Sequence, residues 1–353
     1  MRTFDIDAIS DEGLRREYDF LQRRTESLAA SISRAYGSGR GPIEFRYIND
    51  GKFNAYAGVE ESAYIIEVNA SIPLFMMVLF SRILSERSVI AFLPTAGTKA
   101  SRFTLPAIID PADFDRRANW RVNLNGIRAF AAGTLADMCS TLVAFHELGH
   151  IIGGHVDAIS RIEGEARIAE LLSRVSLKAE AAERRQAWEY EADGIAAFFL
   201  SHFVEELVSE SGKNDRVAEV FARKDGRNAE NALAILIAAA FAFFSYVQGV
   251  RREMRMDSSH PSPMVRAYHL KNVLFAIFQN KPGFDSDLFH QLLDERMDEM
   301  IGVLIKIKLF DDDIFTEEYM DAIDAELERL ALLQKRYRPL CEPFAWISWD
   351  AIS

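Results

Sequence analysis

The chain has 353 residues, of which 49% are hydrophobic and 27% charged, and this is the composition of an ordinary globular protein. Its net charge of -12 opposes contact with a phosphate backbone, so we expect no nucleic-acid partner. Two cysteines that lie far apart, Cys139 and Cys341, argue against a disulfide framework and favour a reducing compartment. Because the N-terminal residues lack an apolar stretch, no signal peptide is visible, and we predict a cytoplasmic protein.

The N-terminal part of the chain mixes helical and extended patterns. Apolar residues at helical spacing predict a helix over 10–35, before the glycines at 37 and 39. Short β-like runs follow, with an Asn-Asp-Gly turn signal after the first, and they predict strands at 43–48, 53–57 and 63–68. Residues 72–84 are strongly apolar and predict a buried helix, whereas the proline-containing segment 87–125 predicts strands and loops.

From about residue 127 onward nearly every segment has a helical pattern. Residues 157–187 are charge-rich and amphipathic, and further amphipathic helices are predicted at 286–309 and 315–336. The acidic run at 311–313 is typical of a solvated helix cap or loop, because carboxylates favour helix N-termini. The tail at 346–353 is too apolar for a free linker, so we expect it to pack onto the protein.

One apolar segment allows two interpretations. Residues 232–250 are long enough to cross a bilayer and are followed by two arginines. The segment is also rich in alanine and contains Ser245 and Gln248, and a buried core helix has the same composition. We favour the core helix, because a single span would separate two motifs that we assign to one site.

The most informative motif is the segment from His146 to His150, which follows an apolar run. Residues four apart lie on one face of a helix, so His146 and His150 present their imidazoles side by side. Neutral imidazole nitrogens are ligands that suit Zn²⁺. Glu147 points about 100° round the helix, where it could take a proton from water on the metal.

A third ligand is required, and His155 is the nearest candidate. If the helix continues, His155 lies on the side opposite His146 and cannot reach the metal. It could do so only if Gly153 and Gly154 break the helix, which glycine permits.

The second candidate for the third ligand lies on a later helix. Glu189 and Asp193 are again four residues apart, so they share one helical face. Glu189 could bind the metal while Asp193 accepts the outward N–H of a ligand histidine. Glu191 points elsewhere and is a reserve ligand, and a solvated charged face would contain the same carboxylates.

These motifs together resemble the M48 family of gluzincin metallopeptidases. The resemblance rests on the His-Glu-Leu-Gly-His segment, the Glu189–Asp193 segment and a later Ser-His-Pro loop at 259–261. The segment 54–57 with the strand at 64–68 is similar to a strand that, in this family, precedes the metal helix and forms the sheet edge near the substrate. The similarity extends in patches over about 54–270. Phage-exclusion peptidases of the Lit type are a looser resemblance.

The resemblance implies a role for several residues. It implies that the metal ligands are His146, His150 and Glu189, that Glu147 is the catalytic base, and that Asp193 orients a histidine. It also implies that a loop brings His260 to face the metal. The several membrane spans common in the family are missing, and residues 87–125 and 284–353 have no counterpart, which affects substrate and location more than chemistry.

Two further residues of the Ser-His-Pro region have alternative interpretations. His260 either belongs to a simple turn before a helix or donates to the oxyanion of a tetrahedral intermediate. Arg266 either positions a substrate carbonyl, which is the role we predict, or pairs with an acidic residue.

We therefore predict an α+β protein, mostly helical, with a zincin-like metallopeptidase fold and a small sheet. The expected parts are an N-terminal helix at 1–40, a peptidase domain at 41–280 and a helical extension at 281–353. The predicted function is a zinc-dependent endopeptidase that acts on a peptide or protein substrate, which adds as a strand beside the edge of the sheet. The alternatives are a catalytically silent zinc-binding regulatory protein and a membrane-anchored protease.

Overall fold

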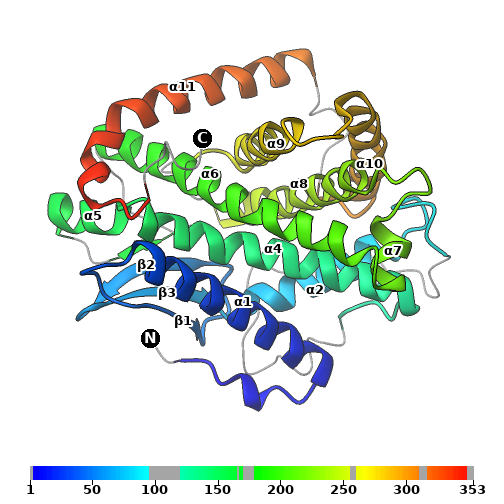
Figure 1. Cartoon of the computed structure of the whole chain (residues 1–353), viewed down its shortest axis with the longest axis horizontal. Coiled ribbons are helices and arrows are strands. Elements are labelled where there is room, and N and C mark those ends of the chain that lie inside the picture. Colours follow the sequence, from blue (N-terminus) through cyan, green and yellow to red (C-terminus); the bar gives the residue numbers. More distant parts are fainter. Residues whose placement is uncertain are drawn as a thin grey trace.

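The computed structural model describes residues 3–94, 120–164, 167–169, 179–254, 260–309 and 316–347. Its described part is mostly helical with one small mixed sheet, which confirms the predicted α+β class. In Figure 1 the sheet and the first helix lie below the long helix α4, and α6 and α11 lie above it. The predictions for residues 95–119, 311–313 and 348–353 fall outside the described residues.

The N-terminal helices and strands follow the sequence pattern closely. They are α1 (Glu12–Tyr36), β1 (Ile43–Ile48), β2 (Ala55–Glu60), β3 (Ala63–Asn69) and α2 (Ser71–Ile83). Helix α1 begins where Asp11 accepts a hydrogen bond of 2.8 Å from the N–H of Leu14, and it ends at Gly37. Between these ends, residues such as Leu14 and Tyr18 bury one face of the helix.

The sheet has the strand order β1-β3-β2-β4, with β4 formed by Arg167–Ala169. Strands β1 and β3 are parallel, whereas β2 pairs antiparallel with β3 on one side and β4 on the other. The resemblance placed the strand near 54–57 at the sheet edge, and this expectation is wrong. Residues Tyr56–Gly58 of β2 are covered by β4, a strand that lay within a segment predicted as helix.

The central and C-terminal helices follow in chain order. They are α4 (Gly126–Ile152), α5 (His155–Glu163), α6 (Ala179–Glu210), α7 (Asp215–Phe221), α8 (Asn228–Met254), α9 (Pro263–Gln279), α10 (Ser286–Lys306) and α11 (Glu317–Cys341). Short 3-10 turns lie at Ile6–Ala8 and Glu342–Phe344. Helix α10 packs on α8, and α11 packs along α6, so both belong to the same hydrophobic core as the central helices.

A buried arginine fixes the start of α4. The guanidinium of Arg128 donates to the carbonyl oxygens of Leu84, Glu86 and Val89 at 3.0–3.1 Å, and also to those of Leu93 and Pro94. These bonds satisfy carbonyls after α2 that have no helical partner. Arg128 thereby joins the end of α2 to the helix that carries the histidine motif.

Helix α8 contains the apolar segment that allowed two interpretations. Every residue from Ala232 to Val247 is buried within the protein, which is the arrangement expected of a core helix. By length and composition alone, two described helices could cross a membrane, namely Gly126–Ile152 and Asn228–Gly249. In this fold 72% and 89% of their apolar windows are buried against the rest of the chain.

The chain after α11 packs against the far end of α4. The N–H of Trp346 donates to the carbonyl oxygen of Ile152 at 2.7 Å. Arg40 donates to the carbonyl oxygen of Ala345 at 3.1 Å, and its guanidinium lies over the ring of Trp346. The described part of the tail, up to residue 347, is therefore packed down as predicted.

Candidate metal centre

The site lies where α4 and α6 pack side by side. A Cβ atom added to Gly149 would lie 2.9 Å from the carbonyl oxygen of Ala192 and 3.1 Å from its Cα. Glycine on α4 and alanine on α6 therefore permit a close approach of the two backbones. Both small residues belong to the motifs that the sequence singled out, and their contact brings the two motifs together.

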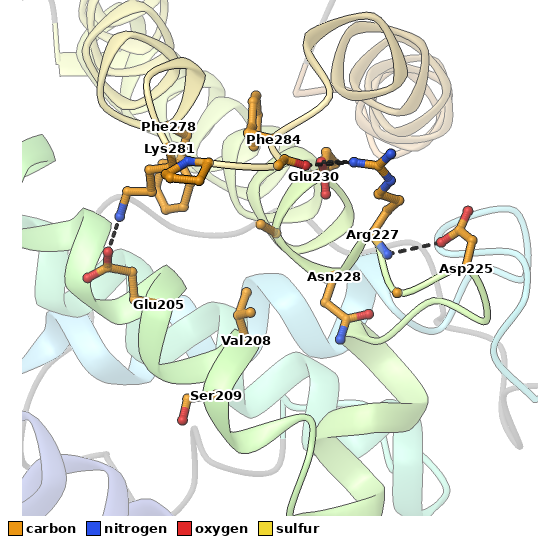
Figure 2. A pocket seen from close by; sticks show the side chains of 14 residues that line it. Glu205, Val208, Ser209, Asp225, Arg227, Asn228, Glu230, Phe278, Lys281 and Phe284 are labelled. Atoms are coloured by element: carbon orange, nitrogen blue, oxygen red, sulfur yellow. Dashed lines mark hydrogen bonds and ion pairs between the residues drawn. The ribbon is translucent and has the colours of Figure 1, made fainter.

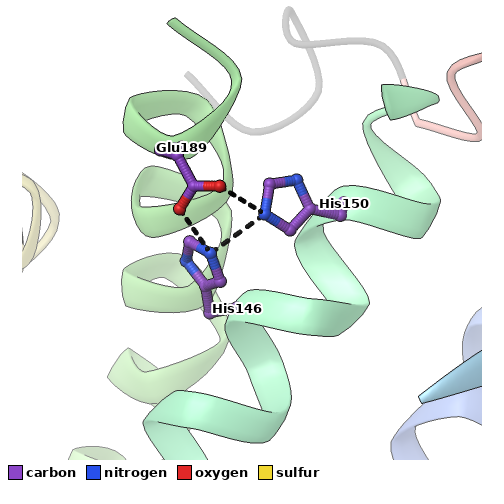
Figure 3. Close-up of side chains that lie close together, drawn as sticks. All are labelled: His146, His150 and Glu189. Atoms are coloured by element: carbon purple, nitrogen blue, oxygen red, sulfur yellow. Dashed lines mark hydrogen bonds and ion pairs between the residues drawn. The ribbon is translucent and has the colours of Figure 1, made fainter. Parts of the chain in front are cut away.

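Three side chains from these helices converge. The Nε2 atoms of His146 and His150 lie 3.0 Å apart, and the carboxylate of Glu189 lies 3.2 Å from the first and 3.3 Å from the second. Figure 3 shows the three side chains pointing toward one another from the two helices. All three are at most 2% exposed. Two nitrogens and a carboxylate so placed could bind a metal ion, and His146, His150 and Glu189 therefore form a candidate metal group.

The electrostatics of the group match this use. Burial lowers the pKa of His150 to about 3, so its imidazole is neutral near pH 7. Burial alone would raise the pKa of Glu189, but its contacts with the surrounding histidines, His260 among them, hold it well below its usual range. A neutral imidazole and an ionised carboxylate are the forms that coordinate a metal.

The other ring nitrogen of His146 is held by an acidic residue. Its Nδ1 lies 2.8 Å from Oδ1 of Asp193, as the sequence predicted. Arg266 donates to both oxygens of Asp193, at 2.7 and 2.8 Å, and both side chains are 3% exposed. Burial opposes ionisation of Asp193, but Arg266 and His146 lower its pKa below the usual range. Arg266 thus pairs with an acidic residue behind His146, rather than lying on a surface open to substrate.

The other ring nitrogen of His150 is held by His155. The helix does break, because α4 ends at Ile152 and Gly154 adopts a φ of 79°. His155 nevertheless does not join the three converging side chains. Its Nδ1 lies 3.0 Å from Nδ1 of His150, on the side of the ring away from Glu189. The reserve ligand Glu191 is buried outside the group, with Oε2 3.9 Å from Nε2 of His155.

The remaining predicted residues lie beside the group. Glu147 follows the first histidine on α4 and is completely buried. His260 lies three residues before the start of α9, and its Nε2 lies 3.5 Å from Oε1 of Glu189. Ser262 caps α9, so the turn interpretation of this segment is correct, and the same turn places His260 at the metal group.

A separate surface pocket of about 720 Å³ lies between the ends of α6, α8 and α9 (Figure 2). Its lining residue Glu205 follows Glu189 by sixteen residues on α6, which places it about 24 Å along the helix axis. The charged groups there pair with one another, as Lys281 does with Glu205. The pocket is therefore distinct from the metal group.

Comparisons of the chain with protein-family models, with curated protein sequences and with solved structures found no match. The functional interpretation consequently depends on the residues and the geometry of the site.

Proposed function

We propose that the protein is a zinc-dependent endopeptidase of the gluzincin type, with a zincin-like fold similar to that of the M48 family. The observation that supports this most is the convergence of His146, His150 and Glu189, with Glu147 directly after the first ligand on the same helix. Two histidines and a glutamate form the ligand set of zinc peptidases that keep a position open for water or substrate. Imidazole and carboxylate ligands also bind iron(II), so what favours zinc is the glutamate that follows the first histidine on the same helix, as in zinc peptidases.

The chain's own residues divide the work of peptide hydrolysis. Zinc, when bound, polarises the substrate carbonyl and lowers the pKa of a water molecule. The water oxygen adds to the carbonyl carbon, and Glu147 takes the proton that is released. As the C–N bond breaks, Glu147 delivers this proton to the departing amine. His260, beside Glu189, donates a hydrogen bond to the carbonyl oxygen as its negative charge develops.

The substrate in this proposal is a peptide or protein that the cytoplasm contains. Within the described residues β4 is the edge strand next to β2, so a peptide could add along the outer side of β4. The buried free cysteines, Cys139 and Cys341, are consistent with a reducing compartment. Fractionation of expressing cells tests the location, because a membrane-anchored protease would sediment with the membranes.

A direct test compares the wild-type chain with Glu147→Gln. The amide keeps the shape of the side chain but cannot accept the proton, so zinc content should remain one ion per chain. Proteolysis of a proteome extract should fall by roughly 10²-fold or more. The control is the double variant His146→Ala/His150→Ala, which should lose zinc and activity together. Stoichiometric zinc in that double variant would contradict the ligand assignment.

One observation favours a second candidate function, a zinc-binding regulatory protein without turnover. The three converging side chains and Glu147 are all almost completely buried, as in a purely structural metal site. This candidate predicts that the wild-type chain binds stoichiometric zinc but does not cleave proteins. It also predicts that Glu147→Gln has the same zinc content and the same lack of proteolysis as the wild type. The presence of a base next to the first ligand favours the peptidase.

A further inference from the structure

His155 is held in place by a left-handed turn at Gly154 and by stacking on Trp188. The left-handed conformation of Gly154 turns the chain after α4, and an added Cβ there would lie 2.7 Å from backbone atoms of Cys341, Phe344 and Ala345. The imidazole of His155 is completely buried and stacks on Trp188, with ring centres 5.7 Å apart and planes at 9°. The turn and the stacking together fix the ring.

The two ring nitrogens of His155 face different partners. Its Nδ1 lies 3.0 Å from Nδ1 of His150, and its Nε2 faces Oε2 of Glu191 at 3.9 Å. When His150 coordinates through Nε2, its Nδ1 must carry the proton and act as a donor. The Nδ1 of His155 is then the acceptor, so the proton of His155 lies on Nε2, the ring nitrogen on the side of Glu191.

We propose that His155 is a positioning residue that fixes the ring and the tautomer of His150. This inference rests on the proposed metal site. His146 has an equivalent support in Asp193, so each ligand histidine is held from behind by a different kind of acceptor. Loss of such an outer partner weakens metal affinity or activity by about 10- to 100-fold.

Two substitutions of His155 separate positioning from packing. His155→Asn keeps an oxygen acceptor close to the position of Nδ1 but loses the ring, whereas His155→Leu fills the space without any acceptor. Zinc affinity is measured by competition with a chromophoric chelator. The Leu variant should bind zinc about 10- to 100-fold more weakly than wild type, and the Asn variant should recover most of this loss. Melting temperatures of the metal-free proteins provide the control for stability.

A packing role predicts the opposite order. Asparagine is smaller and more polar than leucine, so it should be the worse replacement in a buried apolar contact with Trp188. The proposal would therefore be overturned if His155→Asn had both a lower melting temperature and a lower zinc affinity than His155→Leu.

A measurement on the wild-type chain needs no variant to fold. In zinc-loaded protein labelled with ¹⁵N-histidine, the Nδ1–H of His150 should show a through-hydrogen-bond coupling to Nδ1 of His155. If the wild-type chain binds zinc but shows no such coupling, the role of His155 is overturned and the proposed function is not. The same holds if His155→Leu binds zinc as tightly as the wild type. A wild type that binds no zinc overturns the proposed function and this inference with it.

Discussion

Replacement of Arg266 by methionine tests whether this arginine supports the metal site from behind. The guanidinium donates to both oxygens of Asp193 at 2.7 and 2.8 Å, and each side chain is 3% exposed. Removal of one partner leaves a buried charge without compensation, which costs about 3–5 kcal/mol. We therefore expect Arg266→Met to lower the free energy of unfolding of the metal-free protein by about this amount at pH 7.

The matched variants are Asp193→Asn and the double variant. Asp193→Asn removes the carboxylate but leaves the arginine buried, so it should also cost several kcal/mol, roughly 3–5. The double variant removes both charges, and its cost should be smaller than the sum of the two single costs by at least about 2 kcal/mol. Urea unfolding, followed by circular dichroism, measures all four proteins.

The pH dependence provides an internal check. Arg266 and His146 lower the folded-state pKa of Asp193, so its contribution to stability is present above the unfolded pKa near 3.8. That contribution is lost as the pH falls toward the folded pKa, so the cost of Arg266→Met should shrink below about pH 4. Costs that add within about 0.5 kcal/mol would refute the coupling. A higher KM with unchanged stability would instead support the substrate-binding role predicted from sequence.

Three other predictions concern the same helices. Glu189→Ala removes one of the three proposed ligands, so zinc affinity in a chelator competition should fall by more than the roughly 100-fold typical of an outer partner. Burial raises the pKa of Asp137 to about 7, so its carboxyl stabilises the fold only while protonated. Asp137→Asn should raise the free energy of unfolding by roughly 2–4 kcal/mol at pH 8, a gain that disappears as the pH falls toward 4. Gly149→Ala should destabilise the protein and weaken zinc binding, whereas the control Gly302→Ala, on an open helix surface, should do neither.

Helical spacing predicted which residues of the candidate metal group share a helix face, and the resemblance predicted that His146, His150 and Glu189 meet. His146 and His150 on one helix, and Glu189 and Asp193 on another, each had to share a face once the helices formed. The same periodicity predicted α1 and α2 to within two residues. Resemblance supplied His260, whose position beside Glu189 no spacing rule could give.

The sequence could not predict contacts that depend on how distant segments of the chain pack, or elements too short to show a pattern. His155 was weighed only as a ligand, because the turn at Gly154 that aims its ring at His150 depends on the packed tail. Arg266 was assigned to substrate because its distance to Asp193 depends on how α9 packs on α6. Strand β4 has only three residues, too few for a period-two pattern to be visible within a charge-rich segment.

The geometry of the candidate metal group depends on the distance between two helix backbones as much as on the three side chains. Helix α4 carries two nitrogens and α6 carries the carboxylate, so their separation decides whether the three atoms can share one ion. That separation is set where Gly149 meets Ala192, at a distance that an added methyl group would not tolerate. Gly149 and Ala192, which lie within the two motifs, therefore set the spacing of the helices. They let the helices approach closely enough for Glu189 to lie within 3.3 Å of both histidines.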